Sequence, residues 1–358
     1  MLPTITRRAA ALLAGAAIAA VAGGARAQSV AWSPDGRQAA LPRLAPGGQM
    51  HMAIASADGT SVRPVPGGEG ATFASWSPDG RFLALVGEAA LLHDTRTGRT
   101  TRMAAGGLPL VAWRADSHRV AGVCRLDDGA LQVYWHNATE GGRTFSLRLP
   151  VSQVLTGPGQ MVWLPATDDV ALVGGDDSRR DVLTAEAGEV QRITRTGDVL
   201  GLGLSGDGRR LVWARRGPNL RYILLSLYDY DLKSRGSRRL PFPDRLAPLN
   251  PNPRTAPASL HRVVFSPDGS RFVLTAMMGG RGAAAPAPAA FVVALSGLHV
   301  RLLHQSASVS DTESRVLTAS WTPDSRRILL WESGTPPVVR VYNADGTGAS
   351  RLPVQPSL

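Results

Sequence analysis

The sequence predicts an all-β protein, a β-propeller with seven blades of four strands each, and a six-bladed ring is the alternative. Two observations lead to this fold class. A turn motif, Trp76-Ser77-Pro78-Asp79-Gly80-Arg81, is followed by the apolar run Phe82-Leu83-Ala84-Leu85-Val86, and related copies recur along most of the chain. A second turn, often rich in glycine, follows each copy, so every repeat contains two hairpins.

Each copy of the motif has a physical explanation as a hairpin turn. An apolar strand ends at the Trp, Pro sets φ for the next turn position, Asp hydrogen-bonds to the local backbone, and Gly or Ser follows where φ is positive. The copies are spaced by 37 to 61 residues, and repeat periods of this order are typical of propellers and solenoids. Their anchor residues are Trp32, Trp76, Trp113, Trp163, Leu204, Phe265 and Trp321, of which Trp163 begins the poorest copy.

Every repeat contains its own four strands. The first strand begins a few residues after Gln28, and the last ends near Leu352. Because no strand is left over at either end, we expect a ring closed by side-chain packing between the first and last blades, without a swapped strand. That seam should be the weakest contact in the ring.

The composition suits a globular chain with many turns. Of the 358 residues, 44% are hydrophobic and 19% are charged, with 39 Gly and 26 Pro. The only cysteine, Cys124, lies on an expected strand, so we interpret it as a buried structural thiol.

Residues 1–27 have the features of a cleaved secretory signal peptide. Arg7 and Arg8 precede an apolar stretch, and Ala25-Arg26-Ala27 is a small-residue cleavage site before Gln28. The arginine pair resembles a twin-arginine signal, with an ordinary Sec signal as the alternative. We therefore expect a periplasmic protein, with the propeller over residues 28–358 and no membrane-spanning segment.

The net charge is +11, and it becomes 11 − 3 = +8 once the three arginines of the signal peptide are removed. Lys233 is the only lysine. An exported protein meets little nucleic acid, so we do not expect a nucleic-acid partner, but the excess of arginine favours anionic ones.

The four-strand order sorts the connections into two faces. Short turns lie on one face, and the long insertions, such as Pro241 to Ser259 and Met277 to Ala290, lie on the other. Repeat folds often place binding sites on the face that carries insertions, so we expect function there. The candidate binding residues on this long-loop face are Arg43, Arg179, Arg180, Arg215, Arg216, Arg221 and Arg281, which suit carboxylates or phosphates of a partner.

Other motifs favour structure over chemistry. Gly201-Leu202-Gly203-Leu204-Ser205-Gly206 matches a dinucleotide-binding pattern, but it lies on an expected strand with no helix after it. The carboxylate pairs Asp127-Asp128, Asp176-Asp177 and Asp229 with Asp231 favour turn capping or solvation over acid-base catalysis. Tyr222, Tyr228, Tyr230 and Trp331 are interpreted as packing between blades, with a carbohydrate platform as the alternative.

The repeated Trp-Ser-Pro-Asp-Gly-Arg motif resembles the repeat of TolB-type propellers, which prolyl-oligopeptidase-like peptidases share, over nearly the whole mature chain. This resemblance implies a propeller fold and, more weakly, a non-enzymatic role in the cell envelope through binding of another protein. The chain departs from the family, because it has no room for the α/β domain of TolB or for the hydrolase domain of the peptidases. We expect a monomer without cofactors that binds an envelope protein or an anionic glycan.

The alternative function is a lyase or hydrolase that acts on an anionic saccharide at the channel mouth. In repeat type the chain also resembles seven-bladed oligogalacturonate lyases, which implies a divalent-metal site as one variant of this alternative. The weak metal candidates are His51 and His261, with Gln49, Glu88 and Glu332 as the residues that would complete the site. Clustering of these side chains around one point would favour the enzyme.

Overall fold

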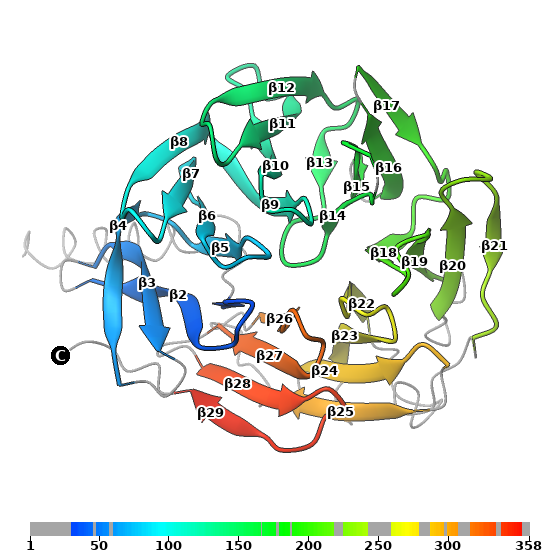
Figure 1. The fold of residues 1–358 in the computed structure, drawn as a ribbon. Coiled ribbons are helices and arrows are strands. Elements are labelled where there is room, and N and C mark those ends of the chain that lie inside the picture. Colours follow the sequence, from blue (N-terminus) through cyan, green and yellow to red (C-terminus); the bar gives the residue numbers. More distant parts are fainter. Residues whose placement is uncertain are drawn as a thin grey trace, which may run out of the picture.

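Seven antiparallel sheets are arranged in a ring in the computed structural model (Figure 1). The structure describes residues 30–45, 48–56, 60–165, 167–176, 179–186, 188–217, 225–242, 259–278, 287–296, 299–306, 316–333 and 338–352. Their regular elements are all strands, and within these ranges no helix has the length and hydrophobicity to cross a membrane. The predicted fold class, with seven blades, is confirmed.

The strands of each blade follow one another in the chain. Blades 1 to 3 contain β1 (Ala31–Trp32), β2 (Gln38–Leu44), β3 (Met50–Ser56), β4 (Val62–Glu69), β5 (Phe73–Trp76), β6 (Phe82–Val86), β7 (Ala89–Asp94), β8 (Thr100–Ala105), β9 (Gly107–Trp113), β10 (Arg119–Arg125), β11 (Leu131–Asn137) and β12 (Arg143–Arg148). Blade 4 contains β13 (Gln153–Val154), β14 (Met161–Trp163), β15 (Val170–Gly175), β16 (Asp181–Glu186) and β17 (Glu189–Arg192). Blades 5 to 7 contain β18 (Val199–Leu204), β19 (Arg210–Arg216), β20 (Leu225–Asp231), β21 (Ser237–Arg239), β22 (Ser259–Phe265), β23 (Arg271–Met278), β24 (Ala287–Ala294), β25 (Val300–Gln305), β26 (Leu317–Trp321), β27 (Arg327–Glu332), β28 (Val338–Asn343) and β29 (Ser350–Leu352).

Blade 4 differs from the other six blades. Its innermost strand is split into β13 and β14, which both pair with β15. The segment between them carries Gly157 and Gly159 with positive φ, which interrupts the strand. The segment from Pro150 to Gln160 is partly sheet, because Gln153 and Val154 are paired within it.

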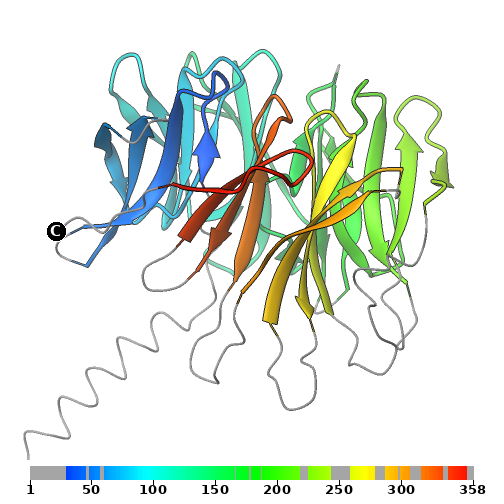
Figure 2. The same cartoon turned by 90° about the horizontal axis from the view of Figure 1, so that it is seen from below.

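The repeated turn is stabilised by its own Ser and Asp side chains. The Ser77 hydroxyl donates to Asp79 Oδ1 at 2.5 Å and accepts the Phe82 backbone N–H at 2.9 Å. Asp79 Oδ1 also accepts the Arg81 N–H at 3.0 Å, and Gly80 has a φ of 74°. The same Ser/Thr to Asp bond recurs at Ser33 and Asp35, Ser205 and Asp207, Ser266 and Asp268, and Thr322 and Asp324. These turns gather at one face of the ring (Figure 2).

Two copies have Ser in place of Gly at the position of positive φ. Ser117 and Ser325 have φ values of 64° and 59°, which are costly for a residue with a side chain. Each hydroxyl accepts a backbone N–H from the turn of the preceding blade, from Asp79 at 3.0 Å and from Asp268 at 2.9 Å. The hydrogen bond between blades offsets the backbone strain.

The motif tryptophans also connect neighbouring blades. Three of their indole N–H groups donate to backbone carbonyls of the preceding blade, Trp76 to Ala31, Trp113 to Ser75 and Trp321 to Val264, at 2.9, 3.2 and 3.0 Å, whereas Trp163 donates to Thr167 in its own turn. At the seam between blades 7 and 1, the equivalent Trp32 Nε1 is buried and finds no partner among the described residues.

The seam is closed by packing, as expected. Val30, Trp32 and Leu41 pack against Leu329, Trp331 and Val339 in one buried cluster. The Ser320 hydroxyl adds a hydrogen bond of 3.1 Å to the Val30 carbonyl. All strands of blade 1 and blade 7 belong to their own repeats, so no strand is swapped. That the seam is the weakest contact stays a prediction.

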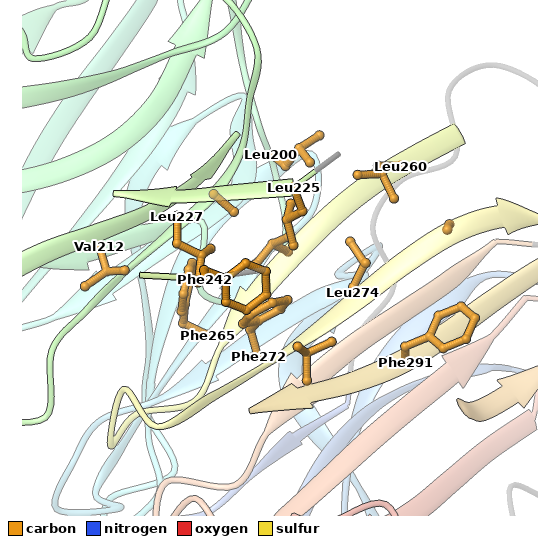
Figure 3. Close-up of a cluster of buried hydrophobic side chains, with 14 of the residues drawn as sticks. Leu200, Val212, Leu225, Leu227, Phe242, Leu260, Phe265, Phe272, Leu274 and Phe291 are labelled. Carbon is orange, nitrogen blue, oxygen red and sulfur yellow. The ribbon is translucent and has the colours of Figure 1, made fainter. Parts of the chain in front are cut away.

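Blades 5 and 6 are joined by an apolar cluster and by unusually close backbones. The Phe265 and Phe272 rings are tilted by 52° with their centroids 5.6 Å apart, and the fully buried Leu225 belongs to the same cluster (Figure 3). A Cβ on Gly201 would lie 2.1 Å from the carbonyl oxygen of Val263.

Two further glycines of the same motif explain why β18 and β22 come so close. Cβ atoms on Gly203 and Gly206 would lie 2.5 Å from Phe265 Cβ and 2.4 Å from the Asp268 carbonyl oxygen. The Gly-x-Gly-x-x-Gly segment thus serves close packing of strands, in agreement with its interpretation as structural.

Candidate functional site

Four basic side chains from three blades meet on the long-loop face, close to the innermost strands. His261 and Arg262 lie near the start of β22, Arg216 ends β19, and Arg180 directly precedes β16. We call Arg180, Arg216, His261 and Arg262 the inner-rim cluster. β18 and β22 lie toward the centre of the ring in Figure 1.

A β-bulge sets the direction of the two residues on β22. Leu260 is paired with Ala276 and Arg262 with Thr275, so His261 is the extra residue. A bulge interrupts the regular alternation of side chains and often re-aims them near functional sites. His261 and Arg262 are therefore not confined to opposite faces of the blade, although they are neighbours in the sequence.

Backbone contacts bring Arg180 and Arg216 to the same place. Arg180 forms an isolated parallel bridge with Asp198, and the Arg216 N–H donates to the Asp198 carbonyl at 3.1 Å. The guanidinium of Arg216 then crosses to blade 6, where Nη2 donates to the Leu260 carbonyl at 2.6 Å. This bond ties the end of β19 to the residue before His261.

Asp181 helps to fix the positions of Arg180 and Asp198 through its hydrogen bonds. Its buried carboxylate accepts hydrogen bonds from the Thr194 hydroxyl and from the backbone N–H groups of Thr196 and Gly197, at 2.8, 2.8 and 3.0 Å. The loop that leads into Asp198 is thereby fixed, and with it the bridge to Arg180. The position of the cluster depends on a satisfied polar network and not only on apolar packing.

The charge of the inner-rim cluster is not balanced by acidic residues. Asp198, whose backbone contacts both Arg180 and Arg216, has its carboxylate bound by Arg215, with Nε to Oδ1 at 2.7 Å and Nη2 to Oδ2 at 2.9 Å. Among the described residues, no carboxylate forms an ion pair with Arg180, Arg216 or Arg262. Three guanidinium groups therefore share one site in which the described residues supply no counter-charge.

The pKa shifts report the resulting positive potential. Burial, together with the charge of Arg180, lowers the pKa of Arg262 to about 10. Burial and the neighbouring Arg216 lower the pKa of Arg180. The pKa of His261 falls below its usual value because of burial and the charges of Arg216, Arg262 and Arg180, so the ring is mostly neutral at pH 7.

The arginines named from the sequence separate into distinct groups. Arg180 and Arg216 belong to the inner-rim cluster, whereas Arg215 is paired with Asp198 and lies over the Tyr228 ring at 5.2 Å. Arg43 lies on β2 of blade 1, opposite His51 on β3, and Arg179 is exposed beside Arg180. Arg221 and Arg281 lie outside the described residues.

The metal candidates are not brought together. His51 is on the third strand of blade 1, and His261 is on the first strand of blade 6. Glu332 is taken by Arg340 at 2.6 Å and by His304 at 3.1 Å. In the ranges that the structure describes, no three His, Cys, Asp or Glu side chains form a group that could hold a metal ion.

In each carboxylate pair, at least one carboxylate has a structural partner. Asp128 caps a turn through the Ala130 N–H and binds Arg148, and the buried Asp229 binds Arg210 and Arg238.

The remaining aromatic and thiol candidates are structural as well. Tyr228 and Tyr230 pack against the core between blades 4 and 5, and Trp331 is buried at the seam. Cys124 is buried, as expected, and Tyr222 lies outside the described residues.

Arg262 is the residue that sequence reasoning missed. It follows His261 directly, and in a regular strand the two side chains would point to opposite faces. The bulge that changes this has no signal in the local sequence. One sequence feature could have indicated it. Arg262 lies among the apolar residues of an innermost strand, where few carboxylates are within reach to pair with it.

No family model matches the chain, and no curated protein matches it significantly. Solved propellers match most of it at low identity, which shows a shared fold alone. An oligogalacturonate lyase in complex with manganese is 15% identical with a TM-score of 0.57, and the match covers 86% of each chain. The propeller domain of the Trilobed protease from Pyrococcus furiosus, reported to have an open velcro topology, is 10% identical with a TM-score of 0.59 over 91% of this chain and 97% of that one.

TolB from Acinetobacter baumannii is 15% identical with a TM-score of 0.50, over 90% of this chain and 65% of that one. The resemblance to TolB-like propellers is thus confirmed at the level of fold. An acylaminoacyl peptidase from Pyrococcus horikoshii also aligns, and the chain spans 52% of its length.

Proposed function

We propose that this protein is an exported, periplasmic propeller of TolB-like type that acts as a monomeric, non-enzymatic scaffold in the cell envelope. It binds an envelope protein through its long-loop face. The observation that carries the proposal is the inner-rim cluster, in which Arg180, Arg216 and Arg262 have no carboxylate partner among the described residues.

The chemistry of the cluster supports an anionic partner. Guanidinium groups are weakly hydrated and present fixed pairs of donors, so they suit carboxylates and phosphates of a second molecule. Like charges that are held together without a counter-charge destabilise one another, and a bound anion removes that repulsion. Although the His261 ring is partly desolvated by its surroundings, Arg216 and His261 both keep solvent-exposed surface, so a partner can reach the cluster from solvent.

Affinity capture from a periplasmic extract, followed by mass spectrometry, tests the binding role. The parent protein is compared with the triple variant Arg180→Ala, Arg216→Ala, Arg262→Ala. The matched control replaces Arg96, Arg209 and Arg326 by Ala, which removes the same charge from exposed positions on the short-turn face. A protein retained by the parent and the control but lost from the triple variant supports the scaffold; equal recovery with all three contradicts it.

Export is tested separately. We expect the mature protein in the periplasm to begin at Gln28, because Ala25-Arg26-Ala27 matches a small-residue cleavage site. Replacing Arg7 and Arg8 by Lys should block export by the twin-arginine route and leave a Sec signal functional. Amino-terminal sequencing of the periplasmic and cytoplasmic fractions distinguishes these outcomes.

A second candidate is a lyase or hydrolase that acts on an anionic saccharide. The same uncompensated arginines favour it, because they would also bind uronate carboxylates. Incubation with polygalacturonate, with and without Mn²⁺, followed by measurement of new chain ends, tests this activity. Depolymerisation that the triple variant loses would replace the scaffold by the enzyme.

A further inference from the structure

The inner-rim cluster has more positive charge than a single carboxylate can balance. Three guanidinium groups lack a counter-charge among the described residues, and His261 adds a largely neutral ring beside them. A carboxylate carries one negative charge, whereas a phosphate monoester carries about −1.5 to −2 at neutral pH. The charge balance therefore favours a dianionic group.

The available donors also suit a tetrahedral anion. Arg180 comes from blade 4, Arg216 from blade 5, and Arg262 with His261 from blade 6, so the donors approach from three directions. Arg216 is partly fixed by its bond to the Leu260 carbonyl, which reduces the side-chain freedom that binding would remove. A planar carboxylate is matched by one arginine in a bidentate pair and would leave the other two without a partner.

A buried amide lies next to this site and maintains its shape. Gln160 is fully buried, and its Nε2 donates to the Val263 carbonyl at 2.9 Å, one residue from Arg262. Gly201 allows β18 to approach that same carbonyl. The backbone next to Arg262 is thus contacted by both blade 4 and blade 5. The position of the Arg262 side chain therefore depends on packing between blades and not on a single loop.

We propose that Arg180, Arg216, Arg262 and His261 form a receptor for a phosphate monoester group. The inference rests on the inner-rim cluster of the proposed function and specifies the chemistry that this cluster recognises. The neutral ring of His261 donates one hydrogen bond to the phosphate, and the three guanidinium groups supply the charge. Both a soluble phosphate ester and a phosphate headgroup on a membrane lipid carry the same group.

Binding of a dianion should be linked to protonation of His261. Among the described residues, the charged groups that act on this ring are Arg216 from β19, Arg180 from the segment before β16, and Arg262 on its own strand, and all three disfavour its protonated form. A bound dianion offsets them, so the pKa of His261 rises on binding. By linkage, a dianion of constant charge must bind more tightly as the pH falls from about 7 to about 5.

The experiment is isothermal titration calorimetry of the full mature chain with inorganic phosphate, glycerol 3-phosphate and acetate at constant ionic strength. We expect both phosphates to bind at least about tenfold more tightly than acetate, and each single Arg→Ala variant of the cluster to lose about tenfold. The control with Ala at Arg96, Arg209 and Arg326 should bind as the parent does. Equal binding of acetate, or equal loss in the control, would overturn the receptor.

Sulfate supplies the pH test, because it stays a dianion over this range. Its affinity should rise at lower pH in the parent, and His261→Gln should abolish that rise while reducing affinity at pH 7 by only about threefold. The His261 ring signal in NMR should titrate at higher pH when sulfate is saturating. An unchanged titration would overturn the role of His261.

Vesicles distinguish the source of the phosphate. Phosphatidylcholine vesicles with phosphatidic acid should recruit the protein only if the cluster accepts a lipid headgroup, and pure phosphatidylcholine is the control. Glycerol 3-phosphate binding without recruitment assigns a soluble ester. If phosphate binds while no protein is captured from the periplasm, the receptor stands and the scaffold fails; capture without phosphate binding gives the opposite result.

Discussion

On the short-turn face, the carboxylates of the repeated turns bind neighbouring hydroxyl and N–H groups, and Arg81 is paired with Asp94 at 2.9 Å. At the inner rim of the opposite face, Arg180, Arg216 and Arg262 share one site, and the adjacent Asp198 is occupied by Arg215. The two regions contain the same residue types. What differs is whether a described carboxylate pairs with the arginine. A paired arginine stabilises the ring, whereas an arginine without such a partner is available to a ligand.

The contrast also holds within the long-loop face. Arg340 binds the buried Glu332 at 2.6 Å, and His304 completes a charged group between blades 6 and 7. Among the described arginines of this face, some therefore have a carboxylate partner and others have none. This gives matched pairs of arginines for testing the comparison.

The largest effect should come from separating the closely packed backbones of β18 and β22 next to the inner-rim cluster. Gly201→Ala places a methyl group 2.1 Å from the Val263 carbonyl oxygen, so the backbones of β18 and β22 must separate. We expect the free energy of unfolding to fall by about 3 kcal/mol or more. Gly236→Ala is the control, because its nearest contact is 3.5 Å away. Urea unfolding measures both; equal stability of the two variants would contradict the close packing.

Acid should weaken the paired group on the long-loop face. Burial opposes ionisation of Glu332, but the Ser306 hydroxyl, Arg340 and His304 outweigh it and lower its pKa to about 2. Because the folded-state pKa lies below the unfolded value of about 4.3, this group stabilises the fold above that pH. The stabilisation, at most about 3 kcal/mol, is lost as the pH falls toward 2.

Unfolding measured between these pH values, in the parent and in Glu332→Gln, checks this expectation. The variant should lose less stability over the range than the parent does, because its amide does not titrate. Parallel curves for the two proteins would show that Glu332 does not carry the acid sensitivity.

A matched pair of arginines on the same face gives the next effect. Arg340→Ala leaves the buried Glu332 without its strongest cation, and we expect a loss of about 2 kcal/mol. Arg262→Ala removes a charge that no described carboxylate pairs with, so stability should stay within about 0.5 kcal/mol of the parent or rise. Denaturant unfolding at pH 7 measures both. Similar losses would mean that Arg262 also serves the fold.

The smallest effect concerns the short-turn face. Ser117→Ala keeps the positive φ of 64° and loses the bond to the Asp79 N–H, so we expect a cost of about 1–2 kcal/mol. Ser117→Gly loses the same bond but removes the strain, and it should cost less. Thermal unfolding ranks the two. If the glycine variant is less stable than the alanine variant, the idea that the hydrogen bond between blades offsets the backbone strain at Ser117 is wrong.

Much of the fold could be predicted from the sequence because the turn motif is local. Ser77, Asp79 and Gly80 make their bonds within a few residues, so the spacing of such motifs gave the number of blades and the order of the strands. Blade 4 was harder, since the glycines Gly157 and Gly159 indicate a break but not that β13 and β14 both pair with β15 on either side of it.

The site was only partly predictable, because it depends on contacts between blades. Arg180 and Arg216 were placed on the correct face by the order of the loops. That Arg215 would be taken by Asp198, and that a bulge at His261 would bring in Arg262, depends on strand register across two blades. Register of this kind has no local signal, because it is set by the packing of whole sheets.

The most direct test of the central claim is thermal unfolding of the parent, the inner-rim triple variant and the control triple variant, each with sulfate and with chloride at equal ionic strength. Without sulfate, the inner-rim variant should unfold at or above the midpoint of the parent, because its arginines do not hold the fold. Sulfate should raise the midpoints of the parent and the control but not that of the inner-rim variant, since a ligand stabilises only a protein that binds it. A destabilised inner-rim variant, or an equal shift in all three proteins, would contradict the claim that these arginines are available for a ligand.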